Sequence, residues 1–219
     1  MSLKPTPVSE KTAQYLNDLF SSEDDFLRNL RQEAAETGMP SISIGGVQGA
    51  FLQVMLRAMR ARFVLEIGSL AGYSAITMAR ALPKRGKVVC MEYNPDYAAF
   101  IRRKADEAGL GDKIEIYVGD AKETLVNYIP QFGFDFVFID ADKPSYSEYL
   151  DLVYPLTRQG GIIAGDNALA WGFVAEDNPE FEPRNVKAIK DFNLALRNHQ
   201  GLSACFVPIG DGMAMGVKL

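Results

Sequence analysis

The sequence predicts an α/β fold: a doubly wound, mostly parallel seven-stranded sheet that ends in a C-terminal antiparallel hairpin. From residue 63 onward, short apolar segments rich in branched and aromatic residues alternate with longer amphipathic stretches, which is typical of a parallel sheet with helical crossovers. The last two apolar segments are separated by Ile209-Gly210-Asp211-Gly212, a sequence that favours a tight hairpin turn. The chain has 219 residues, 47% of them hydrophobic, which suits one domain over residues 1–219 with a full core.

Each expected strand is short and apolar, as a strand buried on both faces should be. The expected strands are 63–67, 87–92, 113–118, 134–139, 161–164, 202–208 and 213–218. The expected helices between them are 73–82, 95–108, 121–129, 145–156 and 183–198. In such a sheet, ligands bind beyond the carboxyl ends of the strands, near the point where the strand order reverses.

Two amphipathic helices, over residues 9–31 and 46–61, are expected before the first strand, as a helical extension over residues 1–61 that packs on the domain or lids it. The first carries a surplus apolar face, made of Tyr15, Leu16, Leu19, Phe20 and Phe26. This face favours a homodimer, although the helices could also lie on their own sheet or cover the site.

The composition excludes several function classes. A net charge of -5 and a pI near 5.0 argue against the broad basic face of a nucleic-acid binder. His199 is the one histidine and there is no cysteine cluster, so a zinc site is not expected. Cys90 and Cys205 lie in apolar runs and are expected to be buried in strands. Without a secretory leader or an apolar run of membrane-spanning length, we expect a cytoplasmic protein with no membrane partner.

Three consecutive strand ends carry features that suit a nucleoside. The first strand runs into Gly68-x-x-x-Gly72, where the glycines let the backbone approach a ligand, and this spacing is not that of a dinucleotide-binding turn. The second ends in Glu92, an acid that can accept hydrogen bonds from both hydroxyls of a ribose. The third ends before Asp120 and Ala121, whose side chain and backbone N–H could contact an adenine edge. Each feature alone could be a structural turn or a helix cap.

The fourth and fifth strands end in polar residues of another kind. Asp140 follows one strand, and Asp166 and Asn167 follow the next, so we expect them to meet at one edge of the sheet. Two carboxylates and an amide suit a hard cation such as Mg²⁺ or Ca²⁺, although a helix cap and an Asx turn would use the same residues. Lys143 lies on the same rim, either as a solvated surface lysine or as a group that could take a proton from a hydroxyl. Asp142 is expected to cap the following helix.

The segment Glu66-Ile67-Gly68-x-x-x-Gly72-Tyr73-Ser74, followed by the acid Glu92, resembles the signature of the small metal-dependent O-methyltransferases. This family includes catechol O-methyltransferase and the caffeoyl-CoA O-methyltransferases. The similarity extends from Ile44-Gly45-Gly46 to the 209–212 turn. The resemblance implies the Rossmann-like methyltransferase fold and an S-adenosylmethionine site.

By this resemblance, Glu92 holds the ribose, Asp120 and Ala121 lie at the adenine, and the methionine end is surrounded by Glu66, Gly68, Ser74, Asp140 and backbone from Ile44. The matching positions for the metal ligands are Asp140, Asp166 and Asn167, with Mg²⁺ the first expectation and Ca²⁺ or Mn²⁺ the others. The proposed general base of the family is a lysine with the Asp-x-x-Lys spacing of Asp140 and Lys143.

The expected function is therefore methyl transfer from S-adenosylmethionine to a hydroxyl of a small acceptor, of catechol type. The alternatives are a dinucleotide-dependent oxidoreductase, a nucleic-acid methyltransferase and a non-catalytic nucleoside-binding module. The missing Gly-x-Gly-x-x-Gly and the paired acids count against the first. The loop 168–183 is expected to lie over the metal edge, and its Trp171 could stack on an aromatic acceptor or only anchor the loop.

Overall fold

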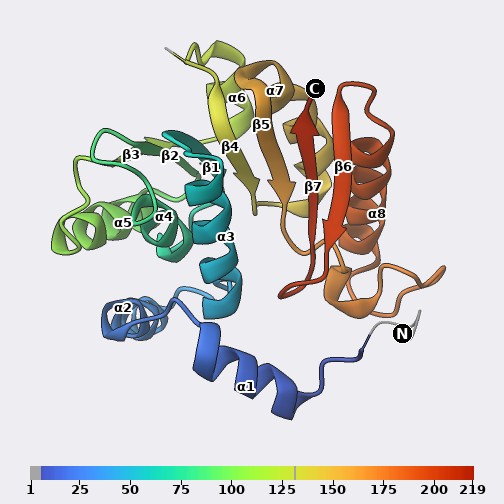
Figure 1. Cartoon of the computed structure of the whole chain (residues 1–219), viewed down its shortest axis with the longest axis horizontal. Coiled ribbons are helices and arrows are strands. Elements are labelled where there is room, and N and C mark those ends of the chain that lie inside the picture. Colours follow the sequence, from blue (N-terminus) through green and yellow to red (C-terminus); the bar gives the residue numbers. More distant parts are fainter. Residues whose placement is uncertain (1–5, 131) are drawn as a thin grey trace.

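A seven-stranded sheet with the order β3-β2-β1-β4-β5-β7-β6 runs through the protein (Figure 1). The computed structural model describes residues 6–130 and 132–219; residues 1–5 and residue 131 lie outside the described part. The strands are β1 Phe63–Ile67, β2 Lys87–Glu92, β3 Ile114–Val118, β4 Phe134–Ile139, β5 Thr157–Gly165, β6 Leu202–Val207 and β7 Met213–Lys218.

The order of the strands reverses between β1 and β4. From β1 the chain winds outward through β2 to β3, and it then returns to β4 and winds the other way to β5, with all of these pairs parallel. β7 inserts antiparallel between β5 and β6. The predicted doubly wound sheet with a closing antiparallel hairpin is confirmed, and its switch point lies at β1 and β4.

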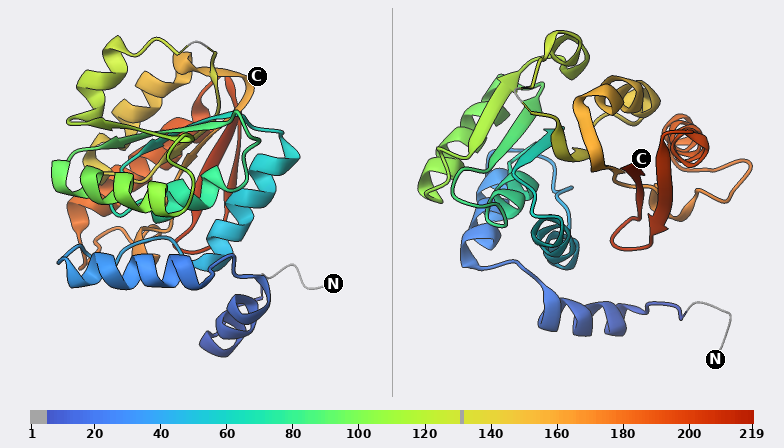
Figure 2. Two further views of the ribbon diagram at one scale, coloured as in Figure 1. Left: turned by 90° about the vertical axis from the view of Figure 1, so that its left-hand side faces the viewer. Right: turned by 45° about the horizontal axis from the view of Figure 1, so that its top comes forward.

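Helices cover both faces of the sheet (Figures 1 and 2). They are α1 Glu10–Phe20, α2 Asp25–Glu36, α3 Gly46–Ala58, α4 Tyr73–Ala79, α5 Pro95–Glu107, α6 Ala121–Asn127, α7 Tyr146–Leu156 and α8 Pro183–Asn198. Buried residues of α2 to α5 form one apolar core, and those of α6 to α8 form a second core on the opposite face. The carboxyl ends of the central strands are thereby left between two helical layers.

The N-terminal segment differs from its prediction. The expected helix over 9–31 is two helices, because the chain is extended at Ser21 and Asp24 starts a new helix by accepting a hydrogen bond from the Leu27 N–H at 3.0 Å. α2 buries Leu27 and Leu30, whereas α1 buries no residue and projects from the rest of the protein beside the start of α3 (Figure 2).

The ends of three other elements also differ from the predicted ranges. β5 begins at Thr157 rather than at 161, with an irregular register where it passes Phe134 and Phe136. The helices expected over 73–82 and 121–129 end earlier, at Ala79 and Asn127. None of the helices formed by the described residues is long and apolar enough to span a membrane.

The two cysteines lie in different surroundings. Cys90 is buried in β2, inside the sheet, as predicted. The prediction for Cys205 was wrong: this thiol is exposed, because β6 is the edge strand of the sheet and most of its residues are not covered.

Candidate active site

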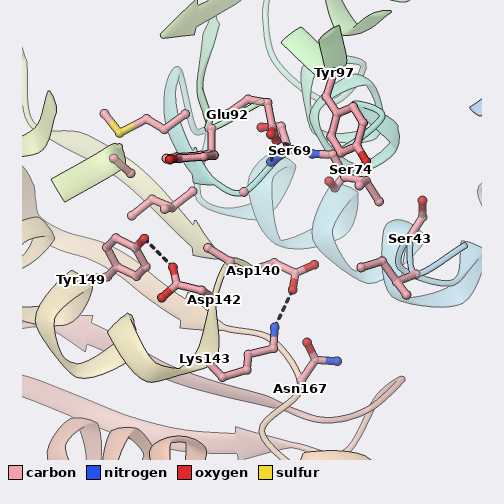
Figure 3. A pocket seen from close by; sticks show the side chains of 18 of the residues that line it. Ser43, Ser69, Ser74, Glu92, Tyr97, Asp140, Asp142, Lys143, Tyr149 and Asn167 are labelled. Carbon is pink, nitrogen blue, oxygen red and sulfur yellow. Dashed lines mark hydrogen bonds and ion pairs between the residues drawn. The ribbon is translucent and has the colours of Figure 1, made fainter. Parts of the chain in front are cut away.

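A cavity of about 720 Å³ opens at the carboxyl ends of β1, β2, β3, β4 and β5 (Figure 3). It lies at the switch point between β1 and β4, where this class of sheet binds ligands. Of the residues predicted as site residues, those that line it are Ile44, Gly68, Ser74, Glu92, Asp120, Ala121, Asp140, Lys143 and Asn167. Glu66 and Asp166 lie behind its wall, almost without exposed surface.

The glycine turn after β1 closes one side of the cavity. Gly68 has a φ of +83°, and a Cβ there would lie 2.2 Å from the backbone oxygen of Asp140. Gly72 has a φ of +78° and precedes α4. The turn therefore requires glycine on two grounds, the left-handed backbone and the close approach of β4.

Glu92 is held by the same turn. One carboxylate oxygen accepts hydrogen bonds from the N–H groups of Ser69 at 3.2 Å and Leu70 at 2.8 Å, and the other accepts from the Asn94 N–H at 2.9 Å. Backbone donors thus fix this carboxylate at the cavity wall, in the place where a ribose was predicted to bind.

Three further predicted residues sit around this end of the cavity. Asp120 caps α6 by accepting a hydrogen bond from the Lys122 N–H at 2.8 Å, and Ala121 is the first residue of that helix. Ser74 belongs to the first turn of α4. The backbone oxygen of Ile44 accepts a hydrogen bond from Arg31, which ties the segment before α3 to α2.

Glu66 is fully buried in β1, beneath the cavity. It accepts a hydrogen bond from the Ser69 hydroxyl at 2.5 Å, and its Oε1 has no hydrogen-bond partner within the described part of the chain. Burial raises the pKa of Glu66 to about 7 against the opposing effect of the Ser69 hydroxyl. A buried carboxyl with a free oxygen suits a cationic group nearby.

Sheet register brings the predicted metal residues together. The Asp140 N–H donates to the Ile67 oxygen, and the Asp166 N–H donates to the Ile139 oxygen, so the two aspartates directly follow neighbouring strands. Lys143 Nζ lies 3.0 Å from Asp140 Oδ1 (Figure 3).

Lys143 has a second partner in Tyr146. Nζ donates to the Tyr146 hydroxyl at 2.8 Å, and Tyr146 itself is fully buried under α8. The lysine is therefore a fixed part of the cavity wall rather than a solvated surface side chain.

Asp166 is only 5% exposed. Its Oδ1 accepts a hydrogen bond from Gln48 Nε2 of α3 at 2.6 Å. Burial, and next the negative charge of Asp140, raise the pKa of Asp166 to about 7. Two carboxylates that disfavour each other's charge are a setting in which a shared cation is stabilising.

Asp142 does not have its predicted role. Its side chain makes no hydrogen bond to the backbone of the following helix. It accepts instead from the hydroxyls of Ser145 and, at 2.8 Å, Tyr149 of α7; the contact with Tyr149 is drawn in Figure 3.

The loop 168–183 reaches the cavity through Trp171. This side chain lines the cavity, is 39% exposed, and packs edge-to-face on Phe181 with ring centroids 5.4 Å apart. Its backbone is left-handed, with a φ of +54°, and its N–H donates to both carboxylate oxygens of Asp211 at 3.0 Å.

Sequence reasoning missed three residues behind this end of the cavity: Gln48, Tyr146 and Asp211. Tyr146 follows Lys143 by three residues, a spacing that could have suggested the contact. Gln48 and Asp211 carried no such signal, because they come from α3 and the β6–β7 turn, 118 and 44 residues from their partners Asp166 and Asn167.

The donor set at this end consists of oxygens. Within residues 6–130 and 132–219, no group of three or more His, Cys, Asp and Glu side chains is placed to hold a metal ion. The set formed by Asp140, Asp166 and Asn167 differs from such a group in having an amide as its third member, and it has the chemistry that Mg²⁺ and Ca²⁺ prefer.

Comparison with known families gives one clear match. The model of the O-methyltransferase family matches residues 17–219. The match therefore spans all seven strands of the sheet and all the residues of the cavity.

Individual relatives agree with this match. The chain is 39% identical to a catechol O-methyltransferase of Niastella koreensis, over 96% of this chain and 97% of that protein. It is 30% identical to a caffeoyl-CoA O-methyltransferase of Petroselinum crispum, over 94% and 90%. Among solved structures, an O-methyltransferase of Bacillus cereus in complex with SAH superposes with a TM-score of 0.85 at 34% identity, covering 94% of this chain and 96% of that one.

Proposed function

Because the chain belongs to the O-methyltransferase family, we propose that it methylates a hydroxyl of a catechol-type acceptor with the help of a divalent metal ion and Lys143. Membership of the family confirms the enzyme class expected from the sequence, an S-adenosylmethionine-dependent O-methyltransferase. It favours methyl transfer over the oxidoreductase and the non-catalytic module. The observation that carries the finer proposal is the contact of Lys143 with Asp140, next to the buried Asp166 and beside the nucleoside end of one cavity.

The cavity fits S-adenosylmethionine. Glu92 presents a carboxylate already fixed by backbone N–H groups, and Asp120 and Ala121 lie on the next strand end. The unbonded Oε1 of Glu66 suits the cationic methionine end. The cofactor supplies a methyl group on a positively charged sulfur.

The opposite end fits a divalent metal ion. Asp140, Asp166 and the amide oxygen of Asn167 would hold it, and the mutual repulsion of the two carboxylates is the reason that a cation would be stabilising there. A bound cation would stabilise the negative charge of an ionising hydroxyl.

The side chains around the cavity have separate roles in the proposed reaction. Lys143 takes the proton of the acceptor hydroxyl at Nζ, and Asp140 holds the ammonium that results. Tyr146 keeps Nζ in place from the other side. The turn after β1 and Glu92 hold the cofactor end, so that both reactants are oriented within one cavity and much of the entropic cost is met on binding.

The donor set favours an acceptor with two adjacent hydroxyls. Asp140, Asp166 and Asn167 would supply three oxygens to a hard cation that prefers about six, so a catechol could supply two adjacent oxygens where a monophenol supplies one. Trp171 offers an aromatic face at the same rim. The 39% identical relative named a catechol O-methyltransferase supports this choice.

The test is methyl transfer to a panel of catechols and matched monophenols, assayed with S-adenosylmethionine before and after EDTA. We expect transfer to catechols to be abolished by EDTA and restored by Mg²⁺. Asp140→Asn and Asp166→Asn should lose this activation, whereas Asp191→Asn, an exposed control on α8, should keep it. Transfer that continues unchanged in EDTA would contradict the metal-dependent mechanism.

We also propose that the protein forms a homodimer through α1. This helix buries no residue, and Tyr15, Leu19 and Phe20 are exposed on it. Sedimentation at micromolar concentration should give about twice the 24.1 kDa mass of the chain; a species of single mass would contradict the dimer. The cytoplasmic location stays a prediction of the sequence.

A further inference from the structure

We propose that Asp211, in the turn between β6 and β7, is a positioning residue that sets the orientation of the Asn167 amide and thereby the metal affinity of the site. The inference rests on the proposed function, in which Asn167 is a metal ligand. It assigns a role to a residue that contacts neither the reacting groups nor, by itself, the cation.

An asparagine ligand has a problem that an aspartate ligand does not have. The oxygen and the NH₂ group of its amide are nearly equal in size, but only the oxygen can bind a cation. An amide that turns by 180° presents a donor to the ion in place of an acceptor. The neighbour on the other side of the amide must therefore decide its orientation.

Asp211 is suited to make this choice. Asn167 Nδ2 lies 3.2 Å from Asp211 Oδ2. An ionised carboxylate only accepts hydrogen bonds, so it bonds the NH₂ end of the amide and repels the oxygen end. In Figure 3 the Asn167 oxygen lies on the side of Lys143, and its nitrogen, which donates to Asp211, is turned away.

Asp211 is itself held firmly. Both of its carboxylate oxygens accept from the Trp171 N–H at 3.0 Å, and its backbone oxygen accepts from the Leu169 N–H at 2.8 Å. At the neighbouring Gly212, a Cβ would lie 2.7 Å from a side-chain carbon of Leu169, so the turn and the loop are in close contact. The carboxylate therefore has little freedom to follow the amide if the amide turns.

The contacts of Asp211 allow two roles, which can be separated. A purely structural role would be to tie Trp171 and the loop in place, and its loss would weaken metal binding whatever residue stands at 167. The proposed role depends on the residue at 167 being an amide. A carboxylate at that position presents an oxygen in either orientation and needs no such partner.

The experiment is a titration of Mg²⁺ alone, by calorimetry, into four forms of the whole chain: wild type, Asp211→Asn, Asn167→Asp and the double variant. Asp191→Asn, exposed on α8 and not among the residues that line the cavity, makes the same chemical change and serves as the control. Asp211→Asn should weaken Mg²⁺ binding by about 10- to 100-fold, the usual effect of changing the partner of a metal ligand, because the NH₂ group introduced at 211 competes for the Asn167 oxygen. Adenosylhomocysteine binding should not change in any form.

In the Asn167→Asp background, Asp211→Asn should not weaken Mg²⁺ binding, because the amide introduced at 211 can donate to the carboxylate introduced at 167. An equal loss of Mg²⁺ affinity in both backgrounds, or no loss in either, would overturn the inference. If Asp211→Asn alone does not fold, Mg²⁺ binding by Asn167→Asp is compared with that by the double variant. A purely structural role of Asp211 predicts weaker Mg²⁺ binding by the double variant, whereas the proposed role predicts equal binding. Failure of the wild type to bind Mg²⁺ would instead contradict the proposed function, and the inference with it.

Discussion

The two ends of the cavity stabilise their carboxylates in opposite ways. At the nucleoside end, Glu92 accepts hydrogen bonds from three backbone N–H groups, two of them from the turn after β1. The opposite end, which we call the chemical end, contains Asp140, Lys143, Asp166 and Asn167. There Asp166 is buried beside the negative charge of Asp140, and the pKa of Asp166 is raised to about 7. The polypeptide alone stabilises the carboxylate of Glu92, whereas the carboxylates of Asp140 and Asp166 would be stabilised by a cation.

The sources of the supporting residues differ as well. The turn that holds Glu92 is one strand away in the sheet and follows β1 directly. The chemical end draws on α3 through Gln48 and on the β6–β7 turn through Asp211. The nucleoside end is thus held mainly by backbone N–H groups at the end of the adjacent strand, and the chemical end by side chains from elements outside the parallel strands.

The largest expected effect is at the chemical end. Lys143→Ala should lower the rate of the methyl-transfer step by about 10²- to 10⁴-fold, the usual contribution of a positioned base, while Mg²⁺ and adenosylhomocysteine binding persist. The measurement is single-turnover methyl transfer to a catechol at saturating cofactor. Lys187→Ala, an exposed lysine of α8, is the matched control. A fully active Lys143→Ala would remove the lysine from the mechanism.

A smaller effect is expected at the nucleoside end. Adenosylhomocysteine at about 100 times its Kd should stabilise the wild type by roughly 2.7 kcal/mol. Glu92→Gln keeps the size of the side chain but loses one acceptor, and a tenfold weaker affinity would reduce this stabilisation to about 1.4 kcal/mol. Glu123→Gln on α6 should behave as the wild type. Equal ligand stabilisation of Glu92→Gln and wild type would mean that Glu92 does not hold the ribose.

The smallest effect is expected at Asp135, a buried carboxylate outside the cavity that provides a further comparison with Glu92. Asp135 lies in β4 and, like Glu92, has ample donors. Burial alone would raise the pKa of Asp135, but the Arg158 guanidinium and the N–H groups of Phe63 and Arg62 outweigh it and hold this pKa below its ordinary value.

The folded state therefore favours the charged form of Asp135. Its contribution to stability is present above the unfolded pKa of about 4 and is lost as the pH falls through the folded pKa. Asp135→Asn should lower the free energy of unfolding by about 1 kcal/mol at pH 7, and the difference from wild type should shrink towards pH 3. Urea unfolding at several pH values measures this, and a difference that is independent of pH would contradict it.

Much of this organisation could be predicted from residue patterns. The alternation of apolar and amphipathic segments was enough for the sheet, because central strands such as β1 and β4 are buried on both faces and helices connect the parallel strands. Asp140 and Asp166 could be placed side by side because each follows a strand directly and those strands pair in parallel register.

Other features depend on packing that no local pattern encodes. The exposure of Cys205 follows from the edge position of β6, and an apolar run does not distinguish an edge strand from a central one. The break between α1 and α2 did have a local signal, since Asp24 is a good N-cap residue within an otherwise amphipathic stretch. Gln48 and Asp211 act only because α3 and the last hairpin fold over the carboxyl end of β5.

The most direct test of the central claim, that one end of the cavity is complete and the other requires a cation, is a pair of calorimetric titrations in the same EDTA-treated sample. Adenosylhomocysteine is titrated first and a catechol second, and both are repeated after Mg²⁺ is added. We predict adenosylhomocysteine binding that is nearly the same with and without Mg²⁺, and catechol binding that appears only with Mg²⁺. Catechol binding of equal strength in EDTA would contradict the claim.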